Sequence, residues 1–339
     1  MKSILKSIKI TDIEGVRIGN AQDYEAMTGA TVILLGKDNR GGIDISGGGP
    51  ASREAHLLAP LTNPHAIHAI VLSGGSAYGL AASTGVMEYL RDKGIGYPVA
   101  GTLIPLVCQS CIFDMTFGTP GKYPDAAMGY AACVDAENGG GPVSGIVGAG
   151  TGAAVGKVRG IYQGQKSGMG YCGFQLGELK VAAVAVVNAL GDVYNPETGE
   201  KLAGVLNKER TEFLSAEEEL YRRQMETWGT AAAEKSVEEV VQPGSNTTLC
   251  AVITNASFSQ ADMSKVASMA RPGLGRCISP VGTMADGDTT YAFSMGDVQA
   301  DINVVGTLAA KAVAGAICDA VRSSRGQMDD EEFLKKINI

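Results

Sequence analysis

A run of seven consecutive apolar residues, Val181–Val187, limits how this chain can fold more than any other segment. It is far shorter than the roughly 20 apolar residues of a membrane-spanning helix, and it predicts a buried strand over Leu179–Asn188. Asn188, which ends the run, must find hydrogen-bond partners for its carboxamide. It therefore either caps a neighbouring element or donates its NH2 to a reacting oxygen.

Other strands and helices follow one another along the chain without a regular period. Strands are expected at 8–19, as a pair around Gly15, and at Thr31–Leu35, Ala69–Leu72, Leu249–Thr254 and Thr289–Ser294. Helices are expected at Ala77–Lys93, Ser215–Thr227, Gln260–Arg271 and Ile302–Arg322, with a solvated connection at 229–246. No internal repeat is visible, and this order favours one layered α/β domain over residues 1–339.

The composition narrows the class of partner and the cell compartment. The net charge is −8 and no strongly basic block is present, so nucleic-acid binding is not expected. Residues 1–10 lack the apolar core of about 7–15 residues that a signal peptide needs, and no membrane span is predicted. The seven cysteines are an odd number, which predicts reduced thiols in a cytoplasmic protein.

The 46 glycines gather in short runs, which predict tight turns where backbone approaches backbone or ligand. One such segment, Gly148–Lys157, has the composition of a phosphate-binding loop but not its spacing. Thr151 stands where the first glycine of G-x-x-x-x-G-K is needed, Val158 stands where Ser or Thr is needed, and Ala153 breaks the dinucleotide pattern. Nucleotide binding is therefore not expected. Lys157 is either solvated or partly buried with a lowered pKa.

Two further motifs invite a metal or redox interpretation, which the sequence does not favour. Cys108 and Cys111 form a lone C-x-x-C without a second pair, which indicates two core thiols rather than a zinc or redox site. His65 and His68 are three residues apart after Pro64, which indicates surface histidines rather than a metal pair. Neither a metal nor another cofactor is predicted.

Asp286 and Asp288 flank Gly287 directly before the strand expected at Thr289–Ser294. Like charges this close raise the pKa of one of the two carboxyls, and an aspartate is costly to bury at the start of a strand. The alternative is a solvated turn, whereas a calcium loop would need further acidic ligands.

The tripeptide Asn246-Thr247-Thr248 leads into the apolar strand Leu249–Thr254 and carries the most information about chemistry. A threonine in mid-chain is a poor nucleophile. If the bond before Thr247 breaks, its own α-amine, with a pKa of about 8, becomes the base that activates its hydroxyl. The alternative is an ordinary loop before a strand, where Asn and Thr are common.

Together these segments resemble the DmpA-type family of self-processing hydrolases, which comprises L-aminopeptidase/D-esterases, β-peptidyl aminopeptidases and nylon-oligomer hydrolases. The resemblance covers nearly the whole chain, and a set of motifs in a fixed order is far more specific than any one of them. In chain order, the motifs that carry it are Gly15–Gly19, Gly47–Pro50, Ser52–Glu54, Leu72–Leu80, Val147–Lys157, Asn246–Ala256 and Asp286–Thr289.

The resemblance implies an αββα sandwich and one self-made cut between Asn246 and Thr247, after which chains 1–246 and 247–339 stay together. It makes Thr247 the nucleophile. Phe113 stands where the nylon-oligomer hydrolases carry a Tyr, so that hydroxyl is missing here or comes from another Tyr. The other residues that it places in the site are Asn188, Lys157, Asp286 and Asp288 as catalytic groups and Gly74, Gly75, Ser76 and Phe113 at the substrate.

The implied reaction is attack of the Thr247 hydroxyl on a carbonyl while the Thr247 amine takes the proton. Asn188 would stabilise the oxyanion, and Lys157 would do the same or tune the amine electrostatically. Asp286 and Asp288 would hold the Thr247 ammonium or the substrate amine. Expected substrates are small peptides and amino amides with a free amino terminus, or amino-acid oligomers.

The implied assembly is a homo-oligomer, with a tetramer expected, in which the two cleaved chains are partners of one another. Two other function classes remain open at this point. One is an acyltransferase similar to the ornithine acetyltransferases, which also use a self-made N-terminal threonine. The other is a binding protein without catalytic activity.

Overall fold

The computed structural model describes residues 4–228 and 245–338, and within these residues two large β-sheets lie face to face. The first sheet has the strand order β1 (Lys6–Ser7), β12 (Met169–Leu176), β13 (Leu179–Asn188), β16 (Thr247–Ala256), β18 (Thr289–Val298) and β4 (Arg40–Ile45). The second has the order β2 (Arg17–Asp23), β3 (Thr28–Leu34), β6 (Ala69–Ser73), β9 (Val107–Cys111) and β5 (Ala51–Arg53).

Helices cover the outer face of each sheet. The helices are α1 (Ala82–Asp92), α2 (Ala126–Glu137), α3 (Ala216–Trp228), α4 (Gln260–Ala270), α5 (Pro272–Cys277), α6 (Ile302–Arg325) and α7 (Asp330–Lys335). Shorter strands pair as β7 (Tyr97–Val99) with β8 (Thr102–Ile104), β10 (Ala154–Val155) with β11 (Gln165–Lys166), and β14 (Asp192–Tyr194) with β15 (Lys201–Ala203) and β17 (Ile278–Ser279).

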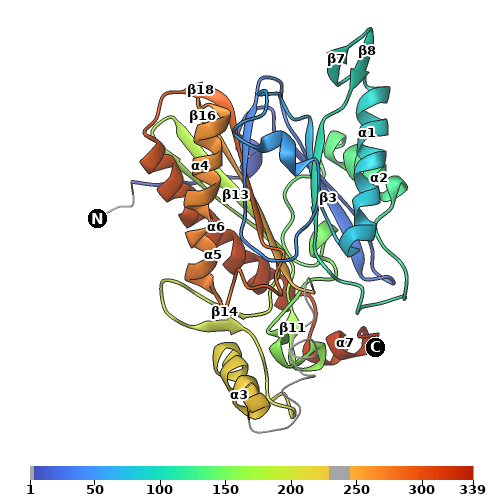
Figure 1. Ribbon diagram of the computed structural model, residues 1–339, viewed down its shortest axis with the longest axis vertical. Helices are drawn as coiled ribbons and strands as arrows, with labels where there is room; N and C mark the ends of the chain where they lie inside the picture. Colours follow the sequence, from blue (N-terminus) through green and yellow to red (C-terminus); the bar gives the residue numbers. More distant parts are fainter. Residues whose placement is uncertain (1–3, 229–244, 339) are drawn as a thin grey trace.

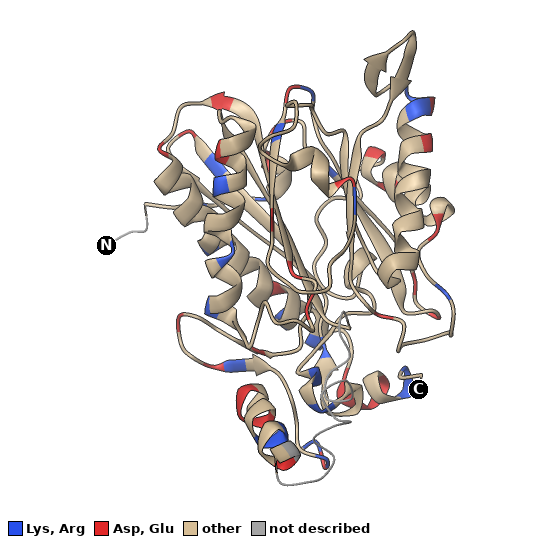
Figure 2. Ribbon diagram, in the orientation of Figure 1, with Lys and Arg blue, Asp and Glu red and all other residues tan. Residues whose placement is uncertain are grey.

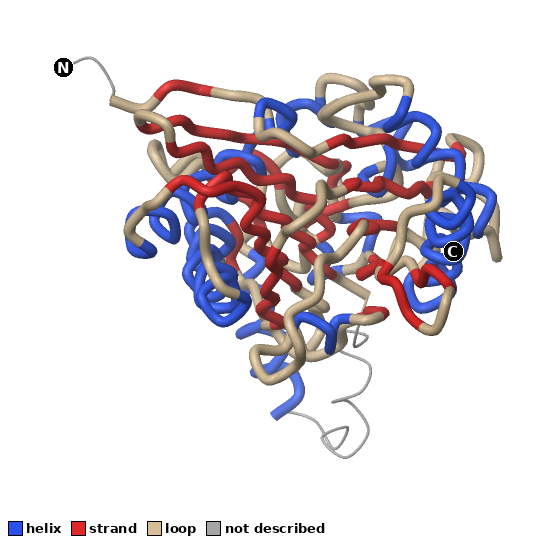
Figure 3. Tube along the Cα trace, turned by 90° about the horizontal axis from the view of Figure 1, so that it is seen from above, coloured by secondary structure: helices blue, strands red, loops and turns tan. Residues whose placement is uncertain are grey.

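The layers follow the order αββα. Figure 1 shows α4, α5 and α6 on the outside of the first sheet and α1 and α2 on the outside of the second. Seen from above, the strands occupy the middle of the molecule and the helices lie around them (Figure 3). The expected layered α/β fold, an αββα sandwich, is therefore confirmed.

Strand β13 shows why the sandwich forms. Val181, Ala183, Ala185 and Val187 belong to the core under α4–α6, whereas the alternate residues belong to the core between the sheets. Because successive side chains of a strand point to opposite faces, a strand covered on both faces needs apolar residues throughout. This is the origin of the continuous apolar run in the sequence.

Helix α6 has the length and composition of a membrane span, yet it lies in the core. Of its most apolar 18-residue window, 72% is buried inside the protein. It is the one such helix in the described residues. It packs along β12 and β13, so its apolar residues cover the sheet rather than face lipid.

Most predicted elements are present with shifted ends, and one is wrong. Residues 8–19 do not form a strand pair around Gly15; Ile10–Asp12 form a turn of 3-10 helix before β2 begins at Arg17. Ile10 and Ile13 are both buried three residues apart, a spacing that suits a helical turn and not a strand. Residues 229–244 of the expected connection lie outside the described part of the chain.

Other differences are smaller. The expected helix Ala77–Lys93 begins as a 3-10 helix, Ser76–Ala81, and continues as α1. The strand expected to end at Ser294 extends to Val298. Helix α2 and strand β12 were not expected, because neither has a clear apolar period; the apolar and polar residues of α2 are mixed around the helix.

The contact between β12 and α6 depends on glycine. A Cβ added to Gly170 would overlap the backbone nitrogen of Ala320 and the carbonyl oxygen of Ala316. We expect Gly170→Ala to lower the free energy of unfolding by about 1–3 kcal/mol, because the helix must move away from the sheet. Gly275→Ala in α5 is the matched control, since nothing lies within 4 Å of the added Cβ. Urea unfolding checks both; equal stability of the two variants would contradict the proposed close approach.

Candidate active site

The pairing of β13 with β16 brings the predicted nucleophile to the predicted oxyanion group. Asn188 and Thr247 are direct partners in the antiparallel register, at the end of both strands. Side chains alternate between the two faces of a strand. Thr247 lies on the same face of β16 as Leu249 and Ala251, which belong to the core between the sheets. Asn188 lies on the same face of β13 as Val184 and Val186, so both side chains point into the space between the sheets. Both residues are buried.

The bond before Thr247 is held in a defined geometry. The Thr247 hydroxyl donates a hydrogen bond to the carbonyl oxygen of Asn246. The same oxygen accepts the backbone N–H of Gly287 at 2.8 Å, and Asn246 forms a parallel β-bridge with Asp286. A backbone N–H aimed at a carbonyl oxygen is the type of donor that stabilises an oxyanion. The sequence alone does not reveal this donor, because it is a main-chain group.

Lys157 connects Asn188 to Ser245, two residues before Thr247. Its Nζ lies 2.8 Å from Oδ1 of Asn188 and 3.1 Å from the carbonyl oxygen of Ser245. Gly156, at φ 69°, places Lys157 at the start of a short 3-10 helix. Burial lowers the pKa of Lys157 to about 7, although the carboxylates of Asp286 and Asp114 oppose this shift. Of the two interpretations of Lys157, partial burial with a lowered pKa is therefore confirmed.

Asn188 uses both ends of its carboxamide. Oδ1 accepts the backbone N–H of Ala154 at 3.1 Å in addition to Lys157, and Nδ2 donates to the carbonyl oxygen of Phe113 at 2.9 Å. Phe113 thus contacts the site through its main chain. The side chain of Asn188 is fixed in orientation by three groups from two different segments of the protein.

The two aspartates are buried, so the solvated-turn alternative is wrong. Asp288 accepts the backbone N–H of Thr248 at 2.6 Å and that of Gly282 at 2.8 Å. Asp286 accepts the backbone N–H and the hydroxyl of Thr283. Burial, and then the neighbouring Asp286 carboxylate, raises the pKa of Asp288 to about 7. The predicted rise of one pKa in the pair is confirmed.

A second buried pair, Asp114 and Lys166, lies beside the site and was missed from the sequence. Asp114 accepts the backbone N–H of Gly75 and the hydroxyl of Thr28, each at 2.7 Å, and burial raises its pKa to about 6. Lys166 donates to the carbonyl oxygen of Ala153 at 2.7 Å, and burial lowers its pKa to about 7. The available signal was a lone lysine within a glycine-rich segment, which is weak.

Gly74, Gly75 and Ser76 reach the site only through the segment Ile112–Asp114. Their backbone N–H groups donate to Gly29, Asp114 and Ile112 respectively, so they shape the turn after β6. Asp114 and Ile112 flank Phe113, which bonds Asn188. The structure therefore brings together Thr247, Asn188, Lys157, Asp286 and Asp288, whereas the substrate contacts of the glycine turn remain a prediction.

The remaining motifs of the sequence lie outside this site. Cys108 and Cys111 are core thiols as expected, and burial raises both pKa values to about 12. His68 is not a surface histidine: it is partly buried, its Nδ1 accepts the N–H of Leu106, and burial lowers its pKa. No group of potential metal ligands occurs in the described residues.

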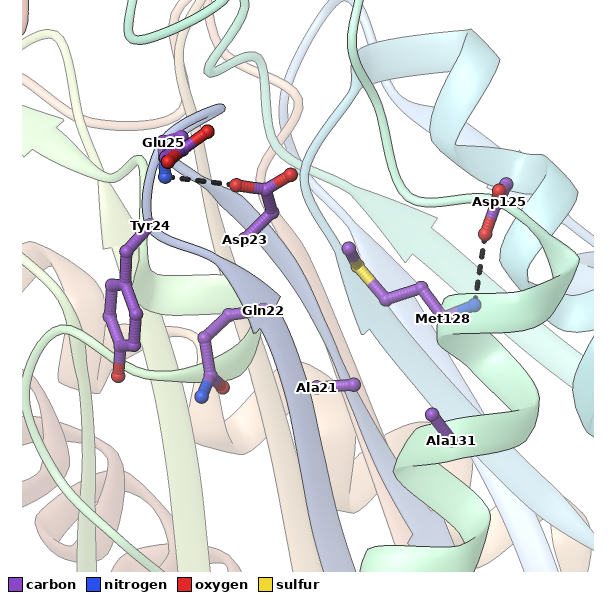
Figure 4. Close-up of a pocket in the computed structure, with 8 residues that line it drawn as sticks. All are labelled: Ala21, Gln22, Asp23, Tyr24, Glu25, Asp125, Met128 and Ala131. Atoms are coloured by element: carbon purple, nitrogen blue, oxygen red, sulfur yellow. Dashed lines mark hydrogen bonds between the residues drawn. The ribbon is translucent and has the colours of Figure 1, made fainter.

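Charged residues are sparse along the strands of the sheets and frequent on helices and loops (Figure 2), whereas Asp286 and Asp288 beside Thr247 are buried. A surface hollow between β2 and α2 is a separate feature (Figure 4). Two of its carboxylates are engaged locally: Asp23 accepts the N–H of Glu25, and Asp125 caps α2 through the N–H of Met128. The hollow is lined by Ala21, Gln22, Asp23, Tyr24, Glu25, Asp125, Met128 and Ala131.

Residues 9–330 match the sequence profile of peptidase family S58. The chain belongs to this family. An uncharacterized aminopeptidase of Mycobacterium leprae is 36% identical over 306 residues, which cover 86% of this chain and 79% of the relative. A 6-aminohexanoate-oligomer endohydrolase of Kocuria sp. strain KY2 is 30% identical over 287 residues, covering 85% and 75%.

Solved structures share the fold of this S58 peptidase. The β-aminopeptidase of Burkholderia sp. superposes with a TM-score of 0.63 at 20% identity, covering 96% of this chain and 92% of that one. The L-aminopeptidase D-Ala-esterase/amidase of Ochrobactrum anthropi gives 0.62 at 16% identity, covering 93% and 86%. At such low sequence identity, these structures show only that the fold is shared.

The family and the curated relatives decide the function class. The chain is an enzyme that hydrolyses peptide or amide bonds, as expected from the resemblance to DmpA-type hydrolases. The comparisons do not favour the acyltransferase alternative, and a binding protein without activity is excluded.

The lowered pKa of Lys157 has a consequence for stability. Between about pH 7 and its ordinary pKa of 10.5, the unfolded chain binds more protons at this lysine than the folded one. The free energy of unfolding should therefore rise with pH in this window, by at most about 1.4 kcal/mol per pH unit. In Lys157→Met, the contribution of this lysine to the pH dependence of the free energy of unfolding should be absent.

Urea unfolding at pH 7.5 and 9.5 measures the effect. Lys335→Met, which removes an exposed lysine of α7, is the control and should keep the wild-type slope. The same slope in Lys157→Met and wild type would show that Lys157 carries its charge equally in both states.

Proposed function

We propose that this S58 peptidase cuts itself once between Asn246 and Thr247 and then hydrolyses amide bonds through an ester on the Thr247 hydroxyl. One observation carries the proposal. The Thr247 hydroxyl lies against the carbonyl group of Asn246, while the Gly287 N–H holds the oxygen of that carbonyl at 2.8 Å. Nucleophile, target and a donor for the developing negative charge are thus present in the uncut chain.

Self-cleavage is an N-to-O acyl shift followed by hydrolysis. Oγ of Thr247 adds to the carbonyl carbon of Asn246, and its proton passes to the Thr247 nitrogen as the C–N bond breaks. The product is an ester between Asn246 and Thr247 with a free α-amine. Water then cleaves the ester, which leaves a carboxyl group on Asn246 and restores the hydroxyl.

Turnover repeats the same attack on a substrate. The new α-amine of Thr247 takes the proton of Oγ, and the hydroxyl oxygen adds to the substrate carbonyl. The proton then passes to the leaving amine as the amide bond breaks. Water hydrolyses the ester and releases the acyl product.

The other groups orient this machinery. Asn188 and the Gly287 N–H are the donors to the oxyanion, Asn188 after exchanging its bond to Phe113 for one to the substrate. Lys157 fixes Oδ1 of Asn188, and we assign to its positive charge the electrostatic tuning of the Thr247 amine. Asp288 holds the backbone of Thr248, and Asp286 lies on the bridge to Asn246, so both fix the strand that carries the nucleophile.

The proposed substrates are small peptides, amino amides and amino-acid oligomers, from which the enzyme releases units from the amino-terminal end. Relatives described as an aminopeptidase and as a 6-aminohexanoate-oligomer endohydrolase support this range. No step of the reaction calls for a cofactor. Cytoplasmic location and assembly into a homo-oligomer, expected as a tetramer of processed subunits, remain parts of the proposal.

Denaturing mass spectrometry of the purified protein tests the cut. We expect two chains, 1–246 and 247–339, with threonine at the second amino terminus. Thr247→Ala should remain a single inactive chain, because the hydroxyl that attacks Asn246 is absent. A Thr247→Ala chain that still divides, or a second chain that begins at another residue, would move the nucleophile elsewhere.

Asn188→Ala tests the oxyanion assignment. We expect the processed variant to lose roughly 10²–10³ in kcat on aminoacyl p-nitroanilides, the usual loss for one such donor. The control is Asn39→Ala, a buried asparagine that bonds backbone groups of Gly36 and Ile67 away from the site. It should lower stability while the folded enzyme keeps its kcat. Near-wild-type turnover by processed Asn188→Ala would leave Asn188 a structural residue.

A further inference from the structure

The uncut junction shows how an acyl chain lies at the nucleophile. Three main-chain groups before Thr247 are held by the protein. The Asn246 carbonyl oxygen accepts from the Gly287 N–H at 2.8 Å, and the Asn246 N–H donates to the Ala285 carbonyl oxygen at 3.3 Å. One residue earlier, the Ser245 carbonyl oxygen accepts from Lys157 Nζ at 3.1 Å. Asn246 forms a parallel β-bridge with Asp286, so the chain at Asn246 runs parallel to 285–287.

This arrangement bears on turnover because both reactions use the same atoms. The acyl group of a substrate is bonded to the same Oγ, and its carbonyl oxygen needs the same donor at Gly287. Its chain must therefore leave the carbonyl carbon in the direction that Asn246 and Ser245 take. Once the new carboxyl end at Asn246 has left the site, the contacts of the junction are available to the substrate.

We propose that Lys157 and the segment Ala285–Gly287 form an acyl-side subsite for at least two residues, in which Lys157 binds the amide carbonyl one residue before the bond to be cut. The inference rests on the proposed function and narrows its substrates. An amino amide with one acyl residue reproduces the contacts to Ala285 and Gly287 but offers nothing to Lys157. A peptide or oligomer with two acyl residues reproduces all three contacts.

The size of the effect follows from the type of bond. A hydrogen bond from a buried amine that carries charge near neutral pH is stronger than a neutral one, and loss of such a bond costs about 10–100-fold in kcat/KM. Lys157 also bonds Asn188, so its removal lowers turnover on every substrate. The quantity that reports the subsite is thus the ratio between substrates, not the activity itself.

The site engages the side chain of the first acyl residue through one hydrogen bond, from Nδ2 of Asn246 to the Ala285 carbonyl oxygen at 3.3 Å. Nδ2 of Asn246 donates to Ser245 Oγ and the Ala285 carbonyl oxygen, but Oδ1 is buried without a hydrogen-bond partner among the described residues. No donor in the site faces Oδ1. Replacing asparagine by alanine at this position therefore loses no hydrogen bond at Oδ1. Alanine substrates are therefore suitable probes.

The test compares alanine p-nitroanilide with alanyl-alanine p-nitroanilide and N-acetyl-alanine p-nitroanilide, the last two of which carry the second carbonyl. In the wild-type enzyme, we expect kcat/KM for alanyl-alanine p-nitroanilide to exceed that for alanine p-nitroanilide by about 10–100-fold. In Lys157→Met, both carbonyl-bearing substrates should lose about tenfold or more relative to alanine p-nitroanilide. Asn39→Ala, the control away from the site, should leave the ratios among the three substrates unchanged.

Equal loss on all three substrates in Lys157→Met would overturn the subsite and leave Lys157 acting through Asn188. A second measurement needs no variant. Early hydrolysis of tetra-alanine by the wild-type enzyme should release alanyl-alanine, whereas release of free alanine alone would also overturn the inference. Failure of the proposed function looks different, since the purified chain would then be uncut by mass and inert toward every substrate.

Discussion

The register between β13 and β16 is the constraint on which the site depends. A slip of one residue would turn every side chain of β16 to the opposite face and carry Thr247 out of the space between the sheets. Such a slip is prevented by the apolar residues on both faces of both strands, which fit two different cores. The position of Thr247, the proposed nucleophile, is therefore determined by the packing of the sandwich along eight residue pairs and not at the site alone.

Polar groups collect where these apolar strands end, and nearly all of them are paired. The carboxylates of Asp286 and Asp288 accept backbone N–H groups, and Lys157 and Lys166 donate to oxygen atoms. Among the described residues of this region, the exceptions are Oδ1 of Asn246, Oγ1 of Thr248 and Oγ of Ser167. A buried acceptor without a donor raises the free energy of the uncut chain, by about 1–3 kcal/mol in typical proteins. Two of these atoms belong to the residues on either side of Thr247.

The sequence sufficed for the parts of this arrangement that depend on neighbours in the chain. The apolar run Val181–Val187 indicates a buried strand, and the motifs around Thr247 and Asp286–Asp288 predict a group of residues that the structure brings together. The expectation of strand residues at Ile10 and Ile13 is wrong, because a short apolar pattern fits both the two-residue period of a strand and the three-residue period of a 3-10 helix. Asp114 and Lys166 cannot be predicted from the sequence, because the pKa of each is shifted only when segments distant in the chain bury it. The Gly287 N–H leaves no mark on the sequence, since every residue but proline carries that group.

The strand order of the first sheet has a consequence for the two chains that a cut at Asn246 would produce. Strands β16 and β18 would belong to the smaller chain, yet β13 and β4 of the larger chain flank them on both sides. Helices α4, α5 and α6, also in the smaller chain, cover the strands of both. The fragments would be interleaved within one sheet, so separation would require unfolding. Neither fragment expressed alone would have a complete core. The cut would free the α-amine of Thr247 without creating a complex that can dissociate.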